Sequence, residues 1–296
     1  MQRPVADAVS VVVPASTANL GSGFDALGMA LALHDTVEFE VTDGGVEVQV
    51  EGEGAGAVPT DERHLVVQAF QKTAQEIGLE LPGIALRCKN QIPHSRGLGS
   101  SAAAAVAGVL GAYALAGRQT DDLALQLAAG FEGHADNAAA SLLGGLVIAW
   151  QQHERFRAVR LEPHRDLAPV VLIPATESAT STTRGLLPAQ VPHADAAFAA
   201  GRSALAVHAL TQRPDLLLPA TADRIHQRYR VPAWPESAEL VAQLRTLGIA
   251  AAISGAGPTV IALPTDHSLP AEISTEGFTV TPLAVDRTGA TAELLG

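Results

Sequence analysis

The segment PHSRGLGSSAAAAVAG, residues 93–108, constrains the fold more than any other part of the chain. Two glycines and two serines run directly into alanines, and residues 97–117 contain no charged side chain. That length could nearly span a bilayer. However, Ala, Gly and Ser have weak transfer free energies, and the segment lacks both Leu/Ile density and flanking aromatic residues. We therefore predict a loop over 93–99, a buried helix over 100–115 and no membrane span.

Two kinds of phosphate-binding loop fit this segment. Gly97-x-Gly99-x-x-Ala102 matches the dinucleotide fingerprint, but that fingerprint needs its first glycine directly after a strand, and residues 93–96 intervene. The other is a glycine-serine loop at a helix N-terminus, where backbone N–H groups and the helix dipole attract an anion. A turn with an N-cap serine and no ligand is the structural alternative. The Walker A pattern is excluded, because no Lys-Ser or Lys-Thr follows the glycines.

Composition indicates a globular chain that can bury a sizeable core, with 47% hydrophobic and 17% charged residues among 296. The net charge of −12 argues against a general nucleic-acid binder, because binding a phosphate backbone needs clustered Lys and Arg. Cys88 is the sole cysteine, so no internal disulfide can form, which fits a reducing cytoplasm. The first residues show no apolar run with a cleavage site, so we expect no secretory signal.

The first half of the chain contains both strand and helix patterns. We predict a hairpin of strands 37–41 and 46–50 around Asp43-Gly44-Gly45. A helix is expected over 64–77, ending at Gly78. Thr120 is expected to be the N-cap of a helix over 121–131. Further strands are predicted over 9–14, 84–92 and 144–150.

The second half begins near Leu167. Strands are predicted over 169–174, 250–254, 259–263 and, as the last of the chain, 278–285; helices are predicted over 195–210 and 236–247. Both halves mix strands and helices without a strict βαβ repeat. We therefore predict an α+β fold of two domains.

Two further glycine-rich segments bear on the first. VPASTANLGSGFDALGMAL, residues 13–31, is a strand followed by a loop that holds Asn19 and Asp25, and ISGAGPTVIAL, residues 253–263, is a turn between two apolar strands. Three such loops can converge on one cleft. Together and in this order they resemble the motifs of the GHMP small-molecule kinases, over most of the chain from about Val11 to Leu263. The first motif, with HADN at 134–137, is most similar to the homoserine kinase branch of that family.

The resemblance implies a two-domain GHMP kinase fold with the active site between the domains. An ATP-binding domain like the second domain of ribosomal protein S5 would occupy 1–160, and a ferredoxin-like domain 161–296. The implied reaction converts ATP and L-homoserine to ADP and O-phospho-L-homoserine, on the route to threonine. The implied setting is cytoplasmic, with a small-molecule substrate and no nucleic-acid or membrane partner, and a homodimer is left open.

The resemblance also implies the sites for ATP and Mg²⁺. Glu132 and Ser100 would hold the metal, as one or two protein oxygens usually do beside substrate phosphates. Without the resemblance, Glu132 would be interpreted as a surface carboxylate at a helix end. The residues implied to cradle the ATP phosphates are Pro93, His94, Ser95, Arg96, Gly97, Leu98, Gly99, Ser100, Ser101, Ala102 and Ala103.

An amino-acid substrate needs an anion for its ammonium group and cations for its carboxylate. Asp25 suits the ammonium, and Asn19 suits either the ammonium or the reacting hydroxyl. Arg184 and Arg230 match the carboxylate-binding arginines of the family, and the guanidinium fork can bind a carboxylate bidentately. The other substrate positions implied are Thr180, His134, Gly255 and Gly257, with the two glycines closing the floor of the cleft.

Some features depart from the family. The compact EGHADN lacks a few residues that some relatives have between the glutamate and the histidine, and HQRYR replaces the form H-E-P-Y-R. Asp136 and Asn137 both fall near the position of a general base in several relatives, although phosphoryl transfer needs no dedicated base. The alternatives are a GHMP kinase for another alcohol, a nucleotide sensor without turnover, and a dinucleotide oxidoreductase. The last would need an N-terminal βαβ unit, which the pattern does not show.

Overall fold

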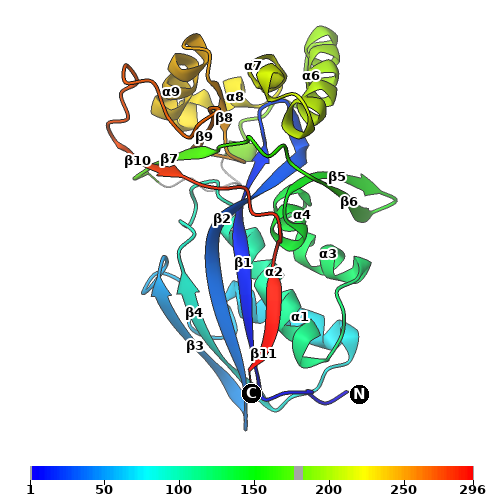
Figure 1. The fold of residues 1–296 in the computed structure, drawn as a ribbon. Coiled ribbons are helices and arrows are strands. Elements are labelled where there is room, and N and C mark those ends of the chain that lie inside the picture. The colour runs from blue at the N-terminus through cyan, green and yellow to red at the C-terminus, as the bar shows by residue number, and fades with distance from the viewer. Residues whose placement is uncertain (1, 177–182, 296) are drawn as a thin grey trace.

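Figure 1 shows the fold in a computed structural model, which describes residues 2–176 and 183–295. In this part of the chain the strands form a sheet of seven strands and a second sheet of four. Helices α1 to α4 lie beside the first sheet, and helices α6 to α9 lie on the outer side of the second (Figure 1). The predicted α+β fold is confirmed.

The first sheet runs in the spatial order β11-β1-β2-β4-β3, with β5 paired to β2 and β6 paired to β5. Its strands are β1 (Ala8–Asn19), β2 (Gly23–Thr42), β3 (Gly45–Gly52), β4 (Gly83–Asn90), β5 (Leu146–Gln152), β6 (Arg155–Leu161) and β11 (Thr291–Leu295). The second sheet runs in the order β10-β7-β9-β8. Its strands are β7 (Val170–Pro174), β8 (Ala250–Ile253), β9 (Val260–Leu263) and β10 (Phe278–Pro282).

Five of the helices lie close to predicted positions, whereas α4, α7 and α8 were not predicted. Those beside the first sheet are α1 (Leu65–Ile77), α2 (Ser100–Leu115), α3 (Asp122–Ala129) and α4 (Asp136–Leu143). Those of the second half are α6 (His193–Thr211), α7 (Leu217–Ala220), α8 (Gln227–Arg230) and α9 (Pro235–Thr246), with 3-10 turns at Pro214–Leu216 and Val231–Ala233.

Helix α2 is buried along most of its length, which explains its composition. Alanine and glycine give it a small radius, so α1 and the first sheet can approach it closely. A Cβ atom on Gly108 would lie 2.4 Å from the carbonyl oxygen of Val66 in α1, and one on Gly111 would lie 2.7 Å from the ring of Phe39 in β2. The uncharged stretch is therefore a helix buried in the core. No helix in the described ranges is long and apolar enough to cross a membrane.

The predicted hairpin of 37–41 with 46–50 is wrong. Strand β4 lies between the two, antiparallel to β2 and parallel to β3. The glycine turn does reverse the chain, but β4 inserts between β2 and β3 and pairs with the edge of each that faces it. At the turn itself Gly83, the first residue of β4, packs so closely that a Cβ atom on it would lie 2.4 Å from the carbonyl carbon of Gly44.

Two smaller predictions are also corrected. Asp121, and not Thr120, is the N-cap of α3, and its carboxylate accepts a hydrogen bond from the backbone N–H of Leu123 at 3.0 Å. The strand expected over 278–285 ends at Pro282 and is not the last. After it, β11 returns to the first sheet and pairs antiparallel with β1.

Candidate active site

The three glycine-rich segments meet in the structure, held together by backbone hydrogen bonds. The N–H of Ser16 donates to the carbonyl of Leu98 at 3.0 Å, which joins the first segment to the second. The N–H of Gly255 donates to the carbonyl of Ala18 at 3.0 Å, which joins the third segment to the first. The hydroxyl of Ser254 completes the junction, because it donates to the carbonyl of Gly97 at 2.6 Å. Segments far apart in the sequence therefore share one floor.

The loop over 93–99 brings the N-terminus of α2 to this junction. Gly97 and Gly99 have φ values of 81° and 71°, in the left-handed region that favours glycine. Space requires glycine as well, since a Cβ atom on Gly99 would lie 2.1 Å from the hydroxyl of Ser16. Gly99 is the N-cap and supplies no side-chain hydrogen bond to the first turn. The N–H groups at the start of α2 are therefore presented to an anion rather than to a capping side chain.

A small cleft of about 120 Å³ opens beside this helix end. Its walls come from all three glycine-rich segments, from the start of α4 and the turn before it, and from two arginines of the second half, one of them in α8. The residues that line it are Ala18, Asn19, Asp25, Ser95, Gly97, Gly99, Ser100, Ser101, Glu132, His134, Asp136, Asn137, Arg184, Arg230, Gly255 and Ala256.

Asp25 and Arg184 face one another across the cleft. The two guanidinium nitrogens Nη1 and Nη2 lie 3.0 and 2.8 Å from the two carboxylate oxygens, a bidentate pair. We expected these residues to bind opposite charges of one substrate, and in the structure they pair with each other. The two residues expected on a loop lie at strand ends, Asn19 as the last residue of β1 and Asp25 near the start of β2. Asn19 holds the turn between these strands in shape, since its Oδ1 accepts from the N–H of Asp25 at 2.9 Å and its Nδ2 donates to the carbonyl of Gly255 at 2.8 Å.

Arg230 is almost completely buried, with 1% of its surface exposed. Its Nη1 lies 3.4 Å from the carbonyl oxygen of Gly255, and its Nε donates to the carbonyl of Thr183 at 3.3 Å. Burial lowers the pKa of Arg230, and the nearby charge of Arg184 lowers it further. A guanidinium keeps its proton in proteins, so the cleft holds two cationic groups close together.

His134, Asp136 and Asn137 form the side of the cleft at the start of α4. His134 Nδ1 lies 2.8 Å from Asp136 Oδ1, the same oxygen that accepts from the N–H of Asn137. The amide of Asn137 is also held, because its Oδ1 accepts from the hydroxyl of Ser16 at 3.0 Å. Burial lowers the pKa of His134, but the hydrogen bond and charge of Asp136, with the charge of Glu132, outweigh it and raise that pKa overall. Both residues that the sequence left as alternatives line the cleft.

Glu132 and Ser100 line the same cleft, so a carboxylate and a hydroxyl oxygen are available at the helix end. Hard-cation chemistry fits this pair, because Mg²⁺ prefers oxygen ligands and keeps several of its sites for phosphates and water. Among residues 2–176 and 183–295 there is no group of three or more His, Cys, Asp or Glu side chains that could hold a metal by itself. A cation here would therefore depend on ligand oxygens.

A second cavity of about 270 Å³ adjoins the cleft on the other side of the loop. Both spaces are lined by Ser95 of the loop and by Ser100 and Ser101 at the start of α2. The two spaces therefore meet at this helix end. The remaining lining residues are Asp35, Val37, Val58, Pro59, Arg63, His64, Leu65, Val66, Asn90, His94, Ala103, Ala104 and Ala107. Nδ1 of His64 is buried in its wall without a hydrogen-bond partner in the described part of the chain.

Several predicted residues lie outside both spaces. Leu98 and Ala102 are fully buried in the core, and Pro93 lines neither cavity. The guanidinium of Arg96 is turned to backbone carbonyls, with Nε at 3.2 Å from Pro174 and Nη2 at 3.0 Å from Ala175.

Among the substrate positions within the described residues, Gly257 does not line the cleft. A Cβ atom on Gly257 would lie 2.7 Å from Trp234, so this glycine allows close packing beneath the turn. Thr180 falls outside the described residues.

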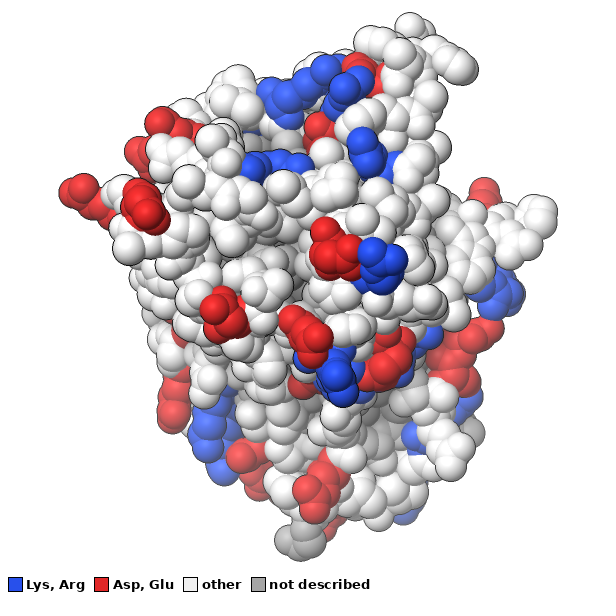
Figure 2. Space-filling model, turned by 45° about the horizontal axis from the view of Figure 1, so that its top comes forward, with Lys and Arg blue, Asp and Glu red and all other residues white. Residues whose placement is uncertain are grey.

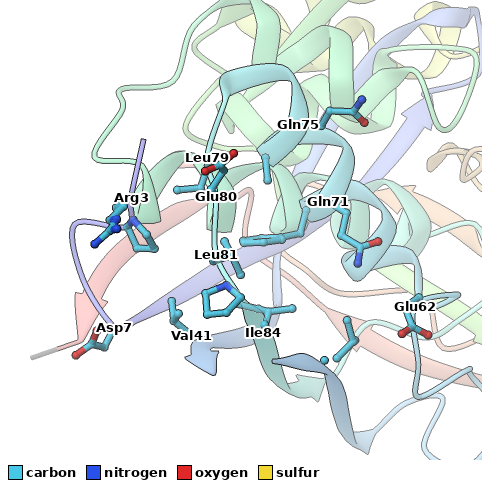
Figure 3. Close-up of a pocket in the computed structure, with 17 residues that line it drawn as sticks. Arg3, Asp7, Val41, Glu62, Gln71, Gln75, Leu79, Glu80, Leu81 and Ile84 are labelled. Atoms are coloured by element: carbon cyan, nitrogen blue, oxygen red, sulfur yellow. The ribbon is translucent and has the colours of Figure 1, made fainter. Parts of the chain in front are cut away.

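A larger cavity, about 1110 Å³, lies elsewhere, and none of the predicted residues lines it. Figure 3 shows Gln71 and Gln75 of α1 on one side of it, with Leu79 and Leu81 from the segment that follows. Volume alone does not mark a reactive site, whereas the small cleft brings together a carboxylate, two guanidiniums and an uncapped helix end. Figure 2 shows acidic and basic side chains mixed over the lower part of the visible face, with several basic side chains gathered at its top.

Comparison with known proteins agrees with this geometry. Family models match at residues 64–145, for the N-terminal domain of GHMP kinases, and at residues 206–276, for their C-terminal domain. Fold and site together define a GHMP kinase. A homoserine kinase from Streptomyces avermitilis is 50% identical over 291 residues, which cover 96% of this chain and 95% of that protein. One from Streptomyces coelicolor is 50% identical over 293 residues, covering 97% and 94%.

Solved structures extend the similarity to three dimensions. The crystal structure of homoserine kinase from Cytophaga hutchinsonii superposes with a TM-score of 0.85 at 26% identity, and covers 98% of both chains. The chain belongs to the homoserine kinase family.

Proposed function

We propose that this chain transfers the γ-phosphoryl group of ATP to the hydroxyl of L-homoserine, giving ADP and O-phospho-L-homoserine on the route to threonine. The observation that supports this best is the set of Asp25, Arg184 and Arg230 beside the uncapped N-terminus of α2. One carboxylate and two guanidiniums suit a zwitterionic amino acid, whereas a sugar or an isoprenoid alcohol would leave at least one of these charges unmatched. We place the reaction in the cytoplasm and assign ATP binding to residues 1–160, with residues 161–296 closing the cleft.

ATP would lie across both spaces. The second cavity, with apolar walls and the buried His64 Nδ1, suits a nucleoside, and the shared serines lead from it to the cleft. The phosphates would then pass the start of α2, where backbone N–H groups and the helix dipole favour negative charge. Mg²⁺ would be held by Glu132 and Ser100 together with phosphate oxygens. When bound, it would neutralise charge that develops on the transferred group.

Homoserine would enter between Asp25 and Arg184 and exchange their ion pair for two new ones. Its ammonium group would bind Asp25 and Asn19, and its carboxylate would bind Arg184 and Arg230. No charge is left unpaired in this exchange, which keeps the desolvation penalty low. His134 and Thr180 are the remaining contacts that we assign to the substrate.

The phosphoryl transfer would be in line and would need little covalent help from the protein. Its transition state is loose, so positioning and charge stabilisation supply most of the rate enhancement. The hydroxyl would lose its proton late. Asp136 already accepts hydrogen bonds from His134 and from the N–H of Asn137, which favours an orienting role for it over that of a free base.

A substrate panel tests this function. Purified protein is given ATP and Mg²⁺ with L-homoserine, mevalonate, galactose or shikimate, ADP release is followed, and products are identified by mass spectrometry. We expect kcat/KM for homoserine to exceed that of every other alcohol by about tenfold or more, equivalent to about 1.4 kcal/mol of transition-state binding. Preference for another alcohol would reject the substrate assignment, and ATP binding without turnover of any of them would favour a sensor.

A further inference from the structure

Phe24 does not itself line the cleft, but its ring lies against both arginines that do. The guanidinium carbon Cζ of Arg184 is 5.7 Å from the ring centroid, and that of Arg230 is 5.5 Å away. The imidazole of His226 stacks on the same ring, with centroids 5.1 Å apart and planes inclined at 26°. One aromatic side chain therefore contacts both arginines and a fully buried histidine.

The hydrogen bonds of His226 fix its tautomer. Nε2 lies 2.8 Å from the carbonyl oxygen of Gly21, and because a carbonyl can only accept, Nε2 must carry the proton. In the neutral ring Nδ1 is then an acceptor, and it lies 3.4 Å from Nη1 of Arg230. Complete burial lowers the pKa of His226, which is consistent with a neutral ring.

The backbone around His226 is held by Asp223. Its carboxylate accepts from the N–H groups of Ile225, His226 and Gln227 at 2.9, 3.2 and 2.8 Å. The nearest approach of that carboxylate to His226 Nε2 is 3.8 Å, too long for a hydrogen bond. Asp223 thus shapes the turn into α8, while Gly21 and Arg230 take the two ring nitrogens.

Arg184 and Arg230 repel one another, so two cations can share the cleft only where something holds each in place. Asp25 does so for Arg184, whereas no carboxylate in the described ranges forms a close ion pair with Arg230. The partners of Arg230 are carbonyl oxygens, the imidazole Nδ1 and the face of Phe24. A ring face attracts a cation through its quadrupole and does not compete for it as a carboxylate would.

We propose that Phe24 and His226 are positioning residues for the substrate carboxylate: they hold the guanidiniums of Arg230 and Arg184 in the orientation that binds it, without neutralising them. The inference rests on the proposed function, because it assigns the ligand of these arginines. His226 also joins the first segment, through Gly21, to the arginine that enters from the second half. Binding of the carboxylate is thereby coupled to the shape of the loop that holds Asp25.

The test uses matched substitutions in the full chain. Phe24→Leu keeps apolar volume but removes the ring face. His226→Asn keeps an acceptor near the position of Nδ1, and His226→Gln keeps a donor near Nε2 but lacks the Nδ1 acceptor. Phe198→Leu is the control, because that ring also contacts two arginines, Arg202 and Arg224, but none of the three lines the cleft. Circular dichroism and melting temperature establish folding of each variant.

We expect Phe24→Leu to raise KM for homoserine about 3- to 30-fold, the range of a partly to fully desolvated cation–π contact. KM for ATP should change less than about twofold. His226→Gln should resemble Phe24→Leu, and His226→Asn should lose less than His226→Gln because it keeps an acceptor for Arg230. Phe198→Leu should stay near the wild type. The amino alcohol that lacks the carboxylate should be a poor substrate of the wild type and lose nothing further in Phe24→Leu. If His226→Gln does not fold, the KM of Phe24→Leu for homoserine tests the inference by itself.

Two results would overturn the inference while leaving the proposed function standing. In the first, the wild type phosphorylates homoserine and the Phe24→Leu variant has an unchanged KM for homoserine. In the second, Phe24→Leu lowers kcat/KM equally for homoserine and for the amino alcohol, which would indicate a structural role only. A wild type that prefers another alcohol would instead reject the proposed function itself.

Discussion

At the scale of single residues, the cleft is organised by charges that pair with groups of the chain itself. Asp25 and Arg184 form a bidentate pair, and Asp136 is bound by His134 and a backbone N–H. Such pairs keep the side chains in position and avoid leaving a buried charge alone. Function at this scale therefore depends on which charges can be exchanged for those of a substrate.

Substituting the arginines separates substrate binding from ATP binding. We expect Arg184→Leu and Arg230→Leu each to lower kcat/KM for homoserine about 10- to 100-fold, since a hydrogen bond to a charged group contributes about 1.5–3 kcal/mol. KM for ATP should change much less. Arg213→Leu is the matched control, because Arg213 pairs with Asp215 on the exposed surface. An effect on ATP alone would assign both arginines to the nucleotide.

Glu132→Gln tests the metal site. The substitution keeps the shape of the side chain but removes its charge, so kcat at saturating Mg²⁺ should fall at least about 100-fold, as for loss of an anionic ligand worth several kcal/mol. The melting temperature should change little, because Glu132 is only partly buried. Glu154→Gln, in the exposed turn between β5 and β6, should leave kcat unchanged. A normal kcat in Glu132→Gln would make Glu132 a surface carboxylate.

At the scale of elements, the position of the loop over 93–99 depends on a buried carboxylate. Asp35 of β2 is 7% exposed, and its Oδ1 accepts from the N–H groups of Gln91 and Ile92 at 2.7 and 2.9 Å. These two residues directly precede the loop. The end of β4 is thereby fixed, and with it the entry to the phosphate-binding segment.

We expect Asp35→Ala to lower the free energy of unfolding by about 1–3 kcal/mol, because buried backbone donors lose their acceptor. Asp35→Asn should lose less, since its amide oxygen can still accept. Urea denaturation of both variants measures the difference. Equal losses would show that packing, and not the acceptor, makes the contribution.

The difference in stability between the wild type and Asp35→Asn should depend on pH in a defined direction. Burial raises the pKa of Asp35 above its ordinary value despite the two backbone hydrogen bonds. A raised pKa in the folded state means that the contribution of Asp35 to stability is complete below the ordinary value of about 3.9 and is lost as the pH rises through the folded-state value. The stability advantage of the wild type over Asp35→Asn should therefore shrink from acidic to neutral pH. A growing advantage would contradict this.

At the scale of the whole molecule, residues near the two ends of the chain pair in one sheet. The N–H of Asp286 donates to the carbonyl of Ala30, and its carboxylate lies 2.7 Å from His34 Nε2. Strand β11 then covers the edge of β1, with Leu295 opposite Ala8. The last residues thus belong to the sheet that the first residues begin, and β1 has no open edge over 8–12.

The reactivity of Cys88 can measure how much the pairing of β11 with β1 stabilises the fold. It is 1% exposed within β4, and burial raises the pKa of its thiol to about 12, so the native protein should react with a thiol reagent at pH 8 only after opening. Truncation after Gly289 removes β11, and we expect it to raise the labelling rate at least about tenfold, through a loss of about 1.4 kcal/mol or more in the free energy of opening. Leu295→Ser keeps the strand pairing and should label like the wild type. Equal rates for the truncation and the wild type would make β11 dispensable.

The sequence by itself determined the elements whose cause is local. The uncharged run over 100–115 forms a helix because alanine favours it, and α1 ends at Gly78 because that residue takes a left-handed φ of 71°. The three glycine-rich segments meet at the cleft, and the resemblance supplied most of the residues that line it, although not Ala18 and Ala256.

Only the tertiary structure decided what depends on partners far away in the chain. Whether β2 pairs with β3 or with β4 depends on competing edges, which residues 37–50 cannot specify. The pairing of Asp25 with Arg184, the contact of Phe24 with Arg230 and the return of β11 to β1 each join residues more than 150 positions apart. Such contacts follow from shape and burial across the whole fold, and no local pattern of residue types records them.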